Sequence, residues 1–255
     1  MLLMVSSSPA LASSYDIVAR MLAPILNPFL ENPPQPEVAI RGTLVLESAA
    51  VGGTAAEPAT PPSLRFAVER PDRLRVEGVL GSQSITVCRV GTRAWAQPGA
   101  AVRELLSRMP APRESAQALG PMRLPVNDIQ AVFLPALLSV NEVDRSVYRG
   151  QKCRVLDLGL MPELARAAGA DAWSARVWVR EADDRPARLG VRGPKFTGVA
   201  RVEQLEYVLS LPPETWVAPE GAESISAGRL FQLVSALMAQ GRAAQRAGTP
   251  RPPAP

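Results

Sequence analysis

Alternation of apolar and polar residues is the feature that most constrains the fold of this chain. The stretch 36–48 places Val38, Ile40, Leu44 and Leu46 on one side of an extended chain, and Arg41, Thr43 and Glu47 on the other. A period of two is that of a β-strand that buries one of its sides. Segments with the same alternation are 63–70 and 72–79, and the stretch 82–99 adds two more strands around a turn at Val90, Gly91 and Thr92. The turns between them are short, so consecutive strands are expected to pair antiparallel.

Strand patterns return in the second half of the chain after a segment of different character. Residues from about 99 to 143 carry Leu, Ile, Val and Phe at helical intervals around a proline-rich connection, and we interpret them as a helical insert. The later strand segments are 151–160, 172–181, 186–193 and 199–210. The whole pattern predicts a mainly β (α+β) fold with about nine to eleven antiparallel strands. An open sheet of that size curls, and helices are expected to cover its inner face.

Helices are predicted both before and after the strands. Ser13 or Ser14 is a suitable N-cap for a short amphipathic helix that runs toward Pro24 and Pro28. At the other end, residues 224–247 are predicted to form a second amphipathic helix. Its apolar stripe consists of Leu230, Phe231, Val234, Leu237 and Met238. This stripe needs a cover, which is either the protein's own sheet and lid or a protein partner.

The two ends of the chain differ from the domain between them. Residues 1–12 combine a short apolar run with Ala10, Leu11 and Ala12, a pattern that signal peptidase accepts, although the usual basic start is missing. We interpret them as a truncated signal peptide and expect export to the periplasm. Residues 13–223 are expected to form one domain, and the proline-rich residues 248–255 a disordered tail. The sequence holds no run of about 18 apolar residues, so it predicts no membrane-spanning helix.

Composition argues against several classes of function. The chain has 255 residues, 47% hydrophobic content and a net charge of +4, which is typical of a globular protein. It has no histidine, and histidine is the commonest general base and zinc ligand. The arginines are interleaved with acidic residues instead of forming a basic stripe, unlike the surface of a nucleic-acid-binding protein. We therefore predict no catalytic site, no metal, no cofactor and no nucleic-acid partner.

The order of five motifs resembles that of a protein family. RGTLVLES (41–48), SLRFAVERPDRLRVEG (63–78) and SITVCRVGTRAWAQPG (84–99) are followed by WSARVWVREADDRPARLGV (173–191) and LEYVLSLPPETWVAPEG (205–221). In this order, one strand ends at an Arg-Pro pair and a later strand carries a tryptophan. A hairpin with an acidic turn follows, and the last strand ends in a proline-rich segment. From about residue 36 to 221, this arrangement is similar to the LolA-like superfamily of periplasmic lipoprotein carriers, which includes LolA, LolB and the N-terminal domain of RseB.

The resemblance implies an open, strongly curved antiparallel half-barrel whose concave face is closed by helices. Members of the family hold acyl chains in that cavity without catalysis. The residues expected to line it here are Leu44, Leu46, Phe66, Val68, Leu74, Val76, Trp95, Phe133 and Leu137. Each methylene group buried there contributes about 0.8 kcal/mol, so two or three acyl chains would bind tightly without polar chemistry.

Arg70 stands at the end of its strand, directly before Pro71. If Phe66 and Val68 face the cavity, the period of two turns Arg70 to the same side. In the family, the arginine of this Arg-Pro step contacts the lid helices and is tied to release of cargo, so the resemblance implies that role for Arg70. The alternative is an arginine whose guanidinium reaches solvent or pairs with an acidic residue.

The pairing of Cys88 and Cys153 is left open by the sequence. Export favours a disulfide. In a simple meander, however, the strands that carry the two cysteines would flank a third strand, at a separation of roughly 9 to 10 Å, which is too far for a bridge.

Taken together, the sequence predicts a non-enzymatic periplasmic carrier or chaperone for the acyl chains of lipids or lipoproteins. Such a carrier serves transport in outer-membrane biogenesis, between an inner-membrane donor complex and an outer-membrane acceptor. The alternative is a periplasmic sensor or scaffold that uses the same half-barrel to bind a lipoprotein or a protein partner. The cargo, the oligomeric state and the role of the C-terminal helix are left open.

Overall fold

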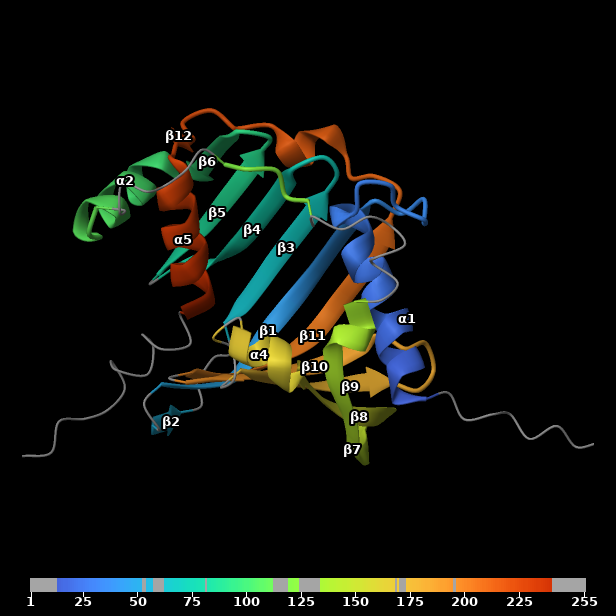
Figure 1. The fold of residues 1–255 in the computed structure, drawn as a ribbon. Coiled ribbons are helices and arrows are strands. Elements are labelled where there is room, and N and C mark those ends of the chain that lie inside the picture. Colours follow the sequence, from blue (N-terminus) through green and yellow to red (C-terminus); the bar gives the residue numbers. More distant parts are fainter. Residues whose placement is uncertain are drawn as a thin grey trace, which may run out of the picture.

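The strands form a single antiparallel sheet that curves but does not close (Figure 1). The computed structural model describes residues 13–51, 54–56, 62–80, 82–111, 119–123, 134–167, 169, 173–194 and 196–239. The strands are β1 (Ala39–Val51), β2 (Thr54–Ala56), β3 (Ser63–Glu69), β4 (Arg73–Leu80), β5 (Gln83–Val90), β6 (Arg93–Gln97), β7 (Leu138–Tyr148), β8 (Gln151–Leu160), β9 (Ser174–Arg180), β10 (Pro186–Gly193), β11 (Phe196–Val208) and β12 (Glu223–Ser224). Their order is β12-β6-β5-β4-β3-β1-β11-β10-β9-β8-β7, with β2 paired to β1. The predicted mainly β, open half-barrel is confirmed.

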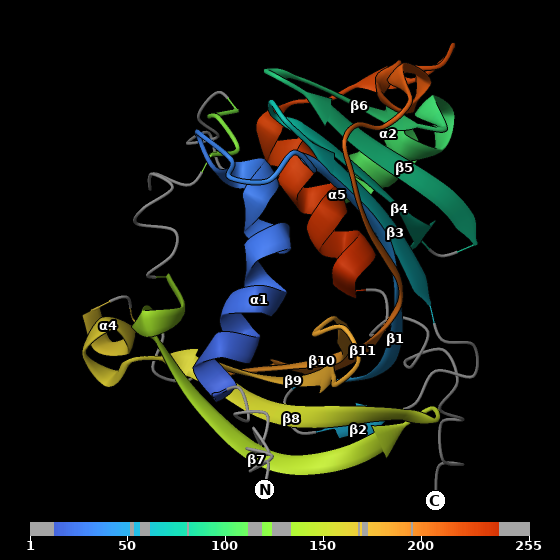
Figure 2. The same ribbon diagram turned by 90° about the vertical axis from the view of Figure 1, so that its right-hand side faces the viewer.

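Two helices lie inside the curve of the sheet, α1 (Ser14–Leu26) and α5 (Ala227–Ala239) (Figure 2). The other helical segments are η1 (Asn27–Phe29), α2 (Gly99–Arg108), η2 (Leu134–Leu137), α4 (Pro162–Ala167) and η3 (Pro213–Trp216). Within the described ranges, none of the helices has both the length and the apolar character needed to span a bilayer.

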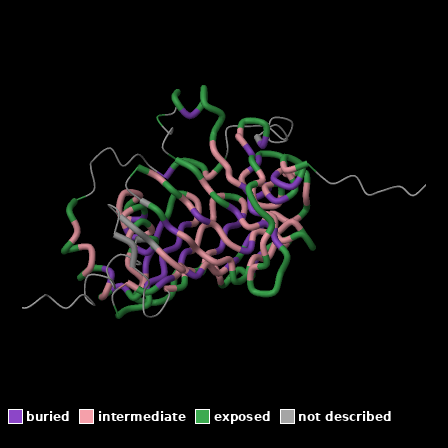
Figure 3. Tube along the Cα trace, turned by 90° about the horizontal axis from the view of Figure 1, so that it is seen from below, coloured by how far each residue is buried: buried purple, intermediate pink, exposed green. Residues whose placement is uncertain are grey.

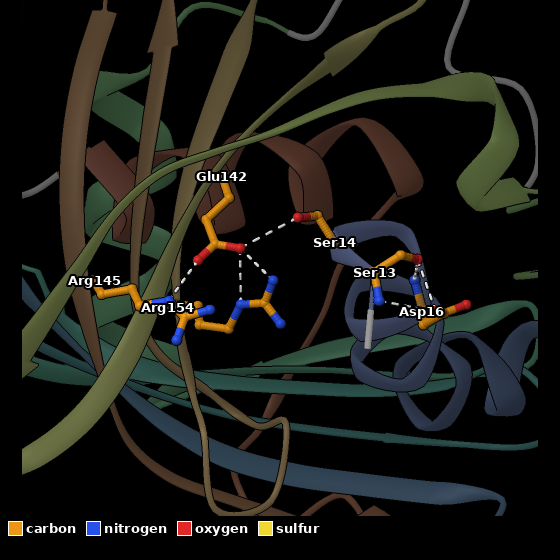
Figure 4. Close-up of polar contacts among 6 residues, drawn as sticks. All are labelled: Ser13, Ser14, Asp16, Glu142, Arg145 and Arg154. Atoms are coloured by element: carbon orange, nitrogen blue, oxygen red, sulfur yellow. Dashed lines mark hydrogen bonds and ion pairs between the residues drawn. The ribbon is translucent and has the colours of Figure 1, made fainter. Parts of the chain in front are cut away.

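The first helix begins with a capping box and is tied to the far edge of the sheet by polar contacts (Figure 4). The Ser13 hydroxyl accepts from the Asp16 backbone N–H, and the Asp16 carboxylate accepts from the Ser13 backbone N–H, which satisfies donors that a helix start leaves free. The Ser14 hydroxyl donates to Glu142 of β7, which also accepts from Arg145 and Arg154. The hydrogen bonds from Arg154 hold the pKa of Glu142 below its ordinary value.

The longest strand pairing joins the first long strand to the last one. β1 pairs with β11 along 13 residues each, and the register shifts between Thr43 and Leu44 and again between Leu46 and Ser48. Such bulges increase local twist and bend a strand, which favours the curvature of the sheet. Because β1 lies between β3 and β11, strands β3 to β6 lie on one side of the β1–β11 pair and β7 to β10 on the other, while β12 returns to pair with β6.

Two apolar clusters lie on the concave face, and a third lies on the convex face. The first, under α5, includes Val76, Ile85, Val87, Leu230 and Leu233. The second, under α1, includes Ile17, Val18, Leu156, Val177 and Val179. The third, on the convex face, includes Ala67, Cys88, Trp95, Leu211 and Trp216. Figure 3 shows buried positions along the sheet interior and exposed ones at the peripheral turns.

Two sequence expectations about the helices differ from the structure. The predicted helical insert 99–143 does contain α2, but β7 begins at Leu138, so its last residues form a strand. Residues 112–118 and 124–133 of the insert lie outside the described residues, as do 1–12 and 248–255. In α5, Leu230 and Leu237 are buried as expected, whereas Phe231 and Met238 are exposed and Leu233 takes their place.

The cysteines are also farther apart than a meander predicted. Cys88 lies on β5 and Cys153 on β8, with six strands between them in the sheet order, because β1 pairs with β11 in the middle. Both thiols are free and buried.

Candidate functional site: the concave face between the two helices

The concave face is identified by α5 and by the pairing of neighbouring strands. A Cβ atom added to Gly78 would lie 3.2 Å from Leu237 of α5, so the side of the sheet to which Gly78 belongs faces the helix. Directly paired residues in antiparallel strands project to the same face. Gly78 pairs with Leu64 and Ile85, and the next pair on the same face, two positions toward the turn, is Phe66 and Val76. These side chains therefore face α5.

The same face continues across the middle strands toward α1. Leu64 pairs with Leu44 of β1, which pairs with Val202 of β11. One step further, Leu46 pairs with Ala200, and Ala200 pairs with Leu189 of β10, which packs against the cluster under α1. The concave face is thus apolar along a path from one helix to the other.

The side chains in the middle of this path do not belong to the buried apolar clusters. Five side chains are half-buried and belong to none of the three clusters: Leu44, Leu46, Phe66, Val202 and Leu205. We call these five residues the central strip. Figure 1 shows β3 and β1 between α5 on one side and α1 on the other. The strip is therefore apolar surface between two helices that each pack on a neighbouring part of the sheet.

A glycine shapes the strip at its centre. A Cβ atom added at Gly42 would lie 2.8 Å from the Phe66 ring and 2.7 Å from the Gln204 carbonyl oxygen. The ring of Phe66 therefore lies across the β1 backbone, in space that only glycine leaves free. The strip ends at Tyr207, which pairs with Ile40. Burial raises the pKa of Tyr207, and the guanidinium carbon of Arg185 lies 5.4 Å from the centre of its ring, so the strip meets a charged side chain at this end.

The structure brings most of the predicted cavity residues to this face. Leu44, Leu46 and Phe66 belong to the central strip. Val68, Leu74 and Val76 project to the same side, and Val76 lies in the cluster under α5. Leu137 ends η2, next to α1, and is exposed. Phe133 lies outside the described residues.

Trp95 is the exception among the predicted residues, because it lies on the convex face. It pairs with Cys88, not with Val87, and packs in the cluster that contains Trp216. The guanidinium carbon of Arg75 lies 5.9 Å from the centre of its ring. The expectation that Trp95 faces the cavity was therefore wrong.

Arg70 contacts the segment that follows α1. Its Nη2 donates to the Glu31 carbonyl oxygen at 2.8 Å, and its backbone N–H donates to the Val38 carbonyl oxygen. Glu31 lies directly after η1 and Leu30, so the guanidinium connects the end of β3 to the chain that leaves the helix. The resemblance implied contact with the lid helices, whereas the partner here is a loop carbonyl, and a role of Arg70 in cargo release stays a prediction.

The sequence did not indicate Val202 and Leu205 as site residues, although their strand was recognised. A bulge at Glu203 separates them by three positions, so period-two alternation along β11 fails there. In the described ranges, no group of three or more cysteine, aspartate or glutamate side chains is arranged to hold a metal ion.

No protein-family model and no curated protein sequence matches this chain. Several solved structures are similar to this chain. One is a chain of the Pseudomonas aeruginosa MucA/MucB complex, which has 15% sequence identity and a TM-score of 0.44; the match covers 84% of this chain and 64% of that one. The Mycobacterium tuberculosis lipoprotein LppX has 8% identity and a TM-score of 0.38, with coverage of 75% and 94%. A LolA superfamily protein from Nitrosomonas europaea has 10% identity and a TM-score of 0.31, with coverage of 82% and 99%.

At these identities the likeness concerns the fold alone. The chain spans less than two thirds of the matched chain in the MucA/MucB complex. The open antiparallel sheet with two helices inside its curve is consistent with the LolA-like fold that the motifs indicated.

Proposed function

We propose that the protein binds the acyl chains of a lipid or a lipoprotein along the central strip, without catalysis. The observation that carries this proposal is the half-buried apolar path between α1 and α5. An acyl chain needs apolar surface and no directed polar contact, and its burial contributes about 0.8 kcal/mol per methylene group. A chain lying over the strip would shield Leu44, Phe66 and Leu205 from water while the two core clusters stay packed.

The finer form of the proposal is a periplasmic carrier that receives cargo from an inner-membrane donor and passes it to an outer-membrane acceptor. The signal-peptidase pattern at Ala10, Leu11 and Ala12 supports export. A sensor that binds a lipoprotein would use the same strip, so the experiment below tests the binding that both roles share.

The test measures acyl binding with a matched pair of variants. Leu205→Gln places an amide in the central strip, whereas Leu209→Gln alters a leucine that follows β11 and is 63% exposed. A fluorescent fatty acid should bind the wild type and Leu209→Gln equally. It should bind Leu205→Gln at least tenfold more weakly, since contact with a leucine side chain is worth roughly 1.5 to 3 kcal/mol when fully buried.

Native mass spectrometry of the gently purified protein provides an independent reading. Acyl lipid that copurifies with the wild type and is depleted in Leu205→Gln supports the proposal. Absence of copurified lipid together with no saturable uptake of the probe would exclude acyl binding at this strip.

A further inference from the structure

The convex face carries a polar groove that plays no part in the acyl-binding proposal. One hollow of about 600 Å³ lies between the outer side of β1, β3 and β4 and the segment Leu211–Thr215. A second, of about 480 Å³, lies between β11 and the turns of the β7–β8 and β9–β10 hairpins. Gln204 and Glu206 of β11 line both hollows, so the two lie next to each other, and we refer to them together as the groove.

The groove has an excess of positive charge. Three arginines line the first hollow and four the second, against four different glutamates in all, because Glu206 belongs to both. Three of the glutamates pair with lining arginines: Glu206 with Arg41, Glu203 with Arg201, and Glu77 with Arg65 and Arg75. Seven arginines against four glutamates leave an excess of three positive charges on the lining.

Several of these guanidinium groups keep unused donors. The Nε of Arg201 is buried and has no hydrogen-bond partner among the described residues. Arg149, in the turn between β7 and β8, makes no ion pair within the described part of the chain. Arg180 and Arg185 share the single carboxylate of Asp183. Guanidinium donors of this kind suit carboxylates, which accept two hydrogen bonds in parallel.

The length and the floor of the groove fit an extended polypeptide. The groove runs from β4 to β10, which is four interstrand spacings or roughly 19 Å, the length of about six extended residues. The side chains of Thr43, Gln204 and Gln151 line the groove and can form hydrogen bonds with a peptide backbone. Ala67 and Leu211 add apolar contacts. The interspersed glutamates would repel the uniform charge of a nucleic-acid backbone, whereas a peptide places carboxylates only where arginines meet them.

We propose that this groove on the convex face binds an extended acidic segment of a partner protein. The partner thus docks on the face opposite the central strip. Phe66, Val202 and Leu205 of the central strip also border the hollows, whereas the groove arginines do not belong to the strip, so variants of the arginines test partner binding separately from acyl binding.

The experiment compares two double variants of the full chain that lose the same charge. Arg65→Gln with Arg149→Gln removes two groove arginines, and Arg65 is 69% exposed with one ion pair. Arg103→Gln with Arg166→Gln is the control, because these arginines lie on α2 and α4, are 67% and 68% exposed and have one ion pair each. The probe is a fluorescein-labelled 12-residue peptide of alternating glutamate and serine, measured by anisotropy at low salt.

The groove variant should bind the probe about five- to tenfold more weakly than the wild type, and the control variant equally well. Both should take up the fatty-acid probe normally, which separates this proposal from acyl binding. Equal weakening in both variants would show attraction by net charge alone and overturn the proposal. Tighter, groove-dependent binding of a 12-nucleotide single-stranded DNA than of the peptide would overturn the assignment to a polypeptide.

Discussion

The face by which α5 docks on the sheet can be tested with two substitutions two residues apart. Leu233 is 0% exposed and lies in the cluster with Val76, Ile85 and Val87. Phe231 is 65% exposed on the same helix. Leu233→Ala removes buried carbon atoms and leaves a cavity, whereas Phe231→Ala removes a ring that is mostly in water.

The expected magnitudes follow from burial. Leucine-to-alanine changes in cores cost about 2 to 5 kcal/mol. Because α5 contacts the sheet with one face only and can shift to fill part of the space, we expect about 2 to 3 kcal/mol for Leu233→Ala. In a domain of this size that lowers the melting temperature by about 5 to 10 °C. Phe231→Ala should cost less than about 0.5 kcal/mol.

The assay is thermal unfolding by far-UV circular dichroism, repeated in urea to obtain the free energy of unfolding. Equal slopes with urea in the three proteins would show that the variants unfold to the same degree. A larger loss for Phe231→Ala than for Leu233→Ala would mean that α5 docks by its other face. No loss in either variant would mean that the helix is not packed on the sheet.

Three further predictions concern Arg70 and the thiols. Arg70→Leu should keep the fold but speed release of the fatty-acid probe about three- to tenfold, because it removes the hydrogen bond to the Glu31 carbonyl; an unchanged dissociation rate would refute this role. Burial raises the pKa of Cys88 to about 12 and also raises that of Cys153, so neither thiol should react with a bulky thiol reagent at pH 8 in the folded protein, and both should react in denaturant. Because the folded state keeps the Cys88 proton, its contribution to stability is present below about pH 9 and is lost as the pH rises toward 12, a slope that Cys88→Ala should reduce.

Local strand pairing could be predicted from the sequence, because it depends on alternation and short turns. The turn between β5 and β6 is enough to predict the face of the sheet to which Trp95 projects. Its two-residue turn pairs Val90 with Arg93, and counting back from there pairs Cys88 with Trp95. Since Ile85 and Val87 face inward, Cys88 and Trp95 must face outward. The error in the position of Trp95 came from treating the strand by itself and not as half of a hairpin.

The docking face of α5 could not be chosen by the same reasoning. Leu230, Leu233 and Leu237 are spaced by three and four residues, and so are Phe231, Val234 and Met238. Both sets form a stripe with helical periodicity, so spacing does not distinguish them. The leucine stripe is buried because it meets Gly78, where the missing side chain lets Leu237 approach the sheet.

The central pairing of β1 with β11 was beyond sequence reasoning for a different reason. It joins residues 145 to 169 positions apart, and hairpin turns carry no information about such contacts. Two bulges also interrupt its alternation, so neither strand shows which of its residues meet across the pair. The site depends on this pairing, since Val202 and Leu205 come from β11 and Leu44 and Leu46 from β1.

The two helices beside the central strip are held by different interactions, which bears on how the strip can be reached. Helix α5 is docked mainly by buried leucines, which salt affects little. Helix α1 also packs by apolar residues, but its contacts at both ends are polar: Ser14 donates to Glu142, Arg20 pairs with Asp184 at 2.6 Å, and the loop after η1 is held by Arg70. Exposed ion pairs of this kind contribute little each and weaken with ionic strength. Both helices bury three apolar residues, so they differ in the polar contacts that only α1 adds. If acyl chains bind the strip, we therefore expect added salt to ease their entry on the side next to α1, and an entry rate that does not depend on ionic strength would contradict this.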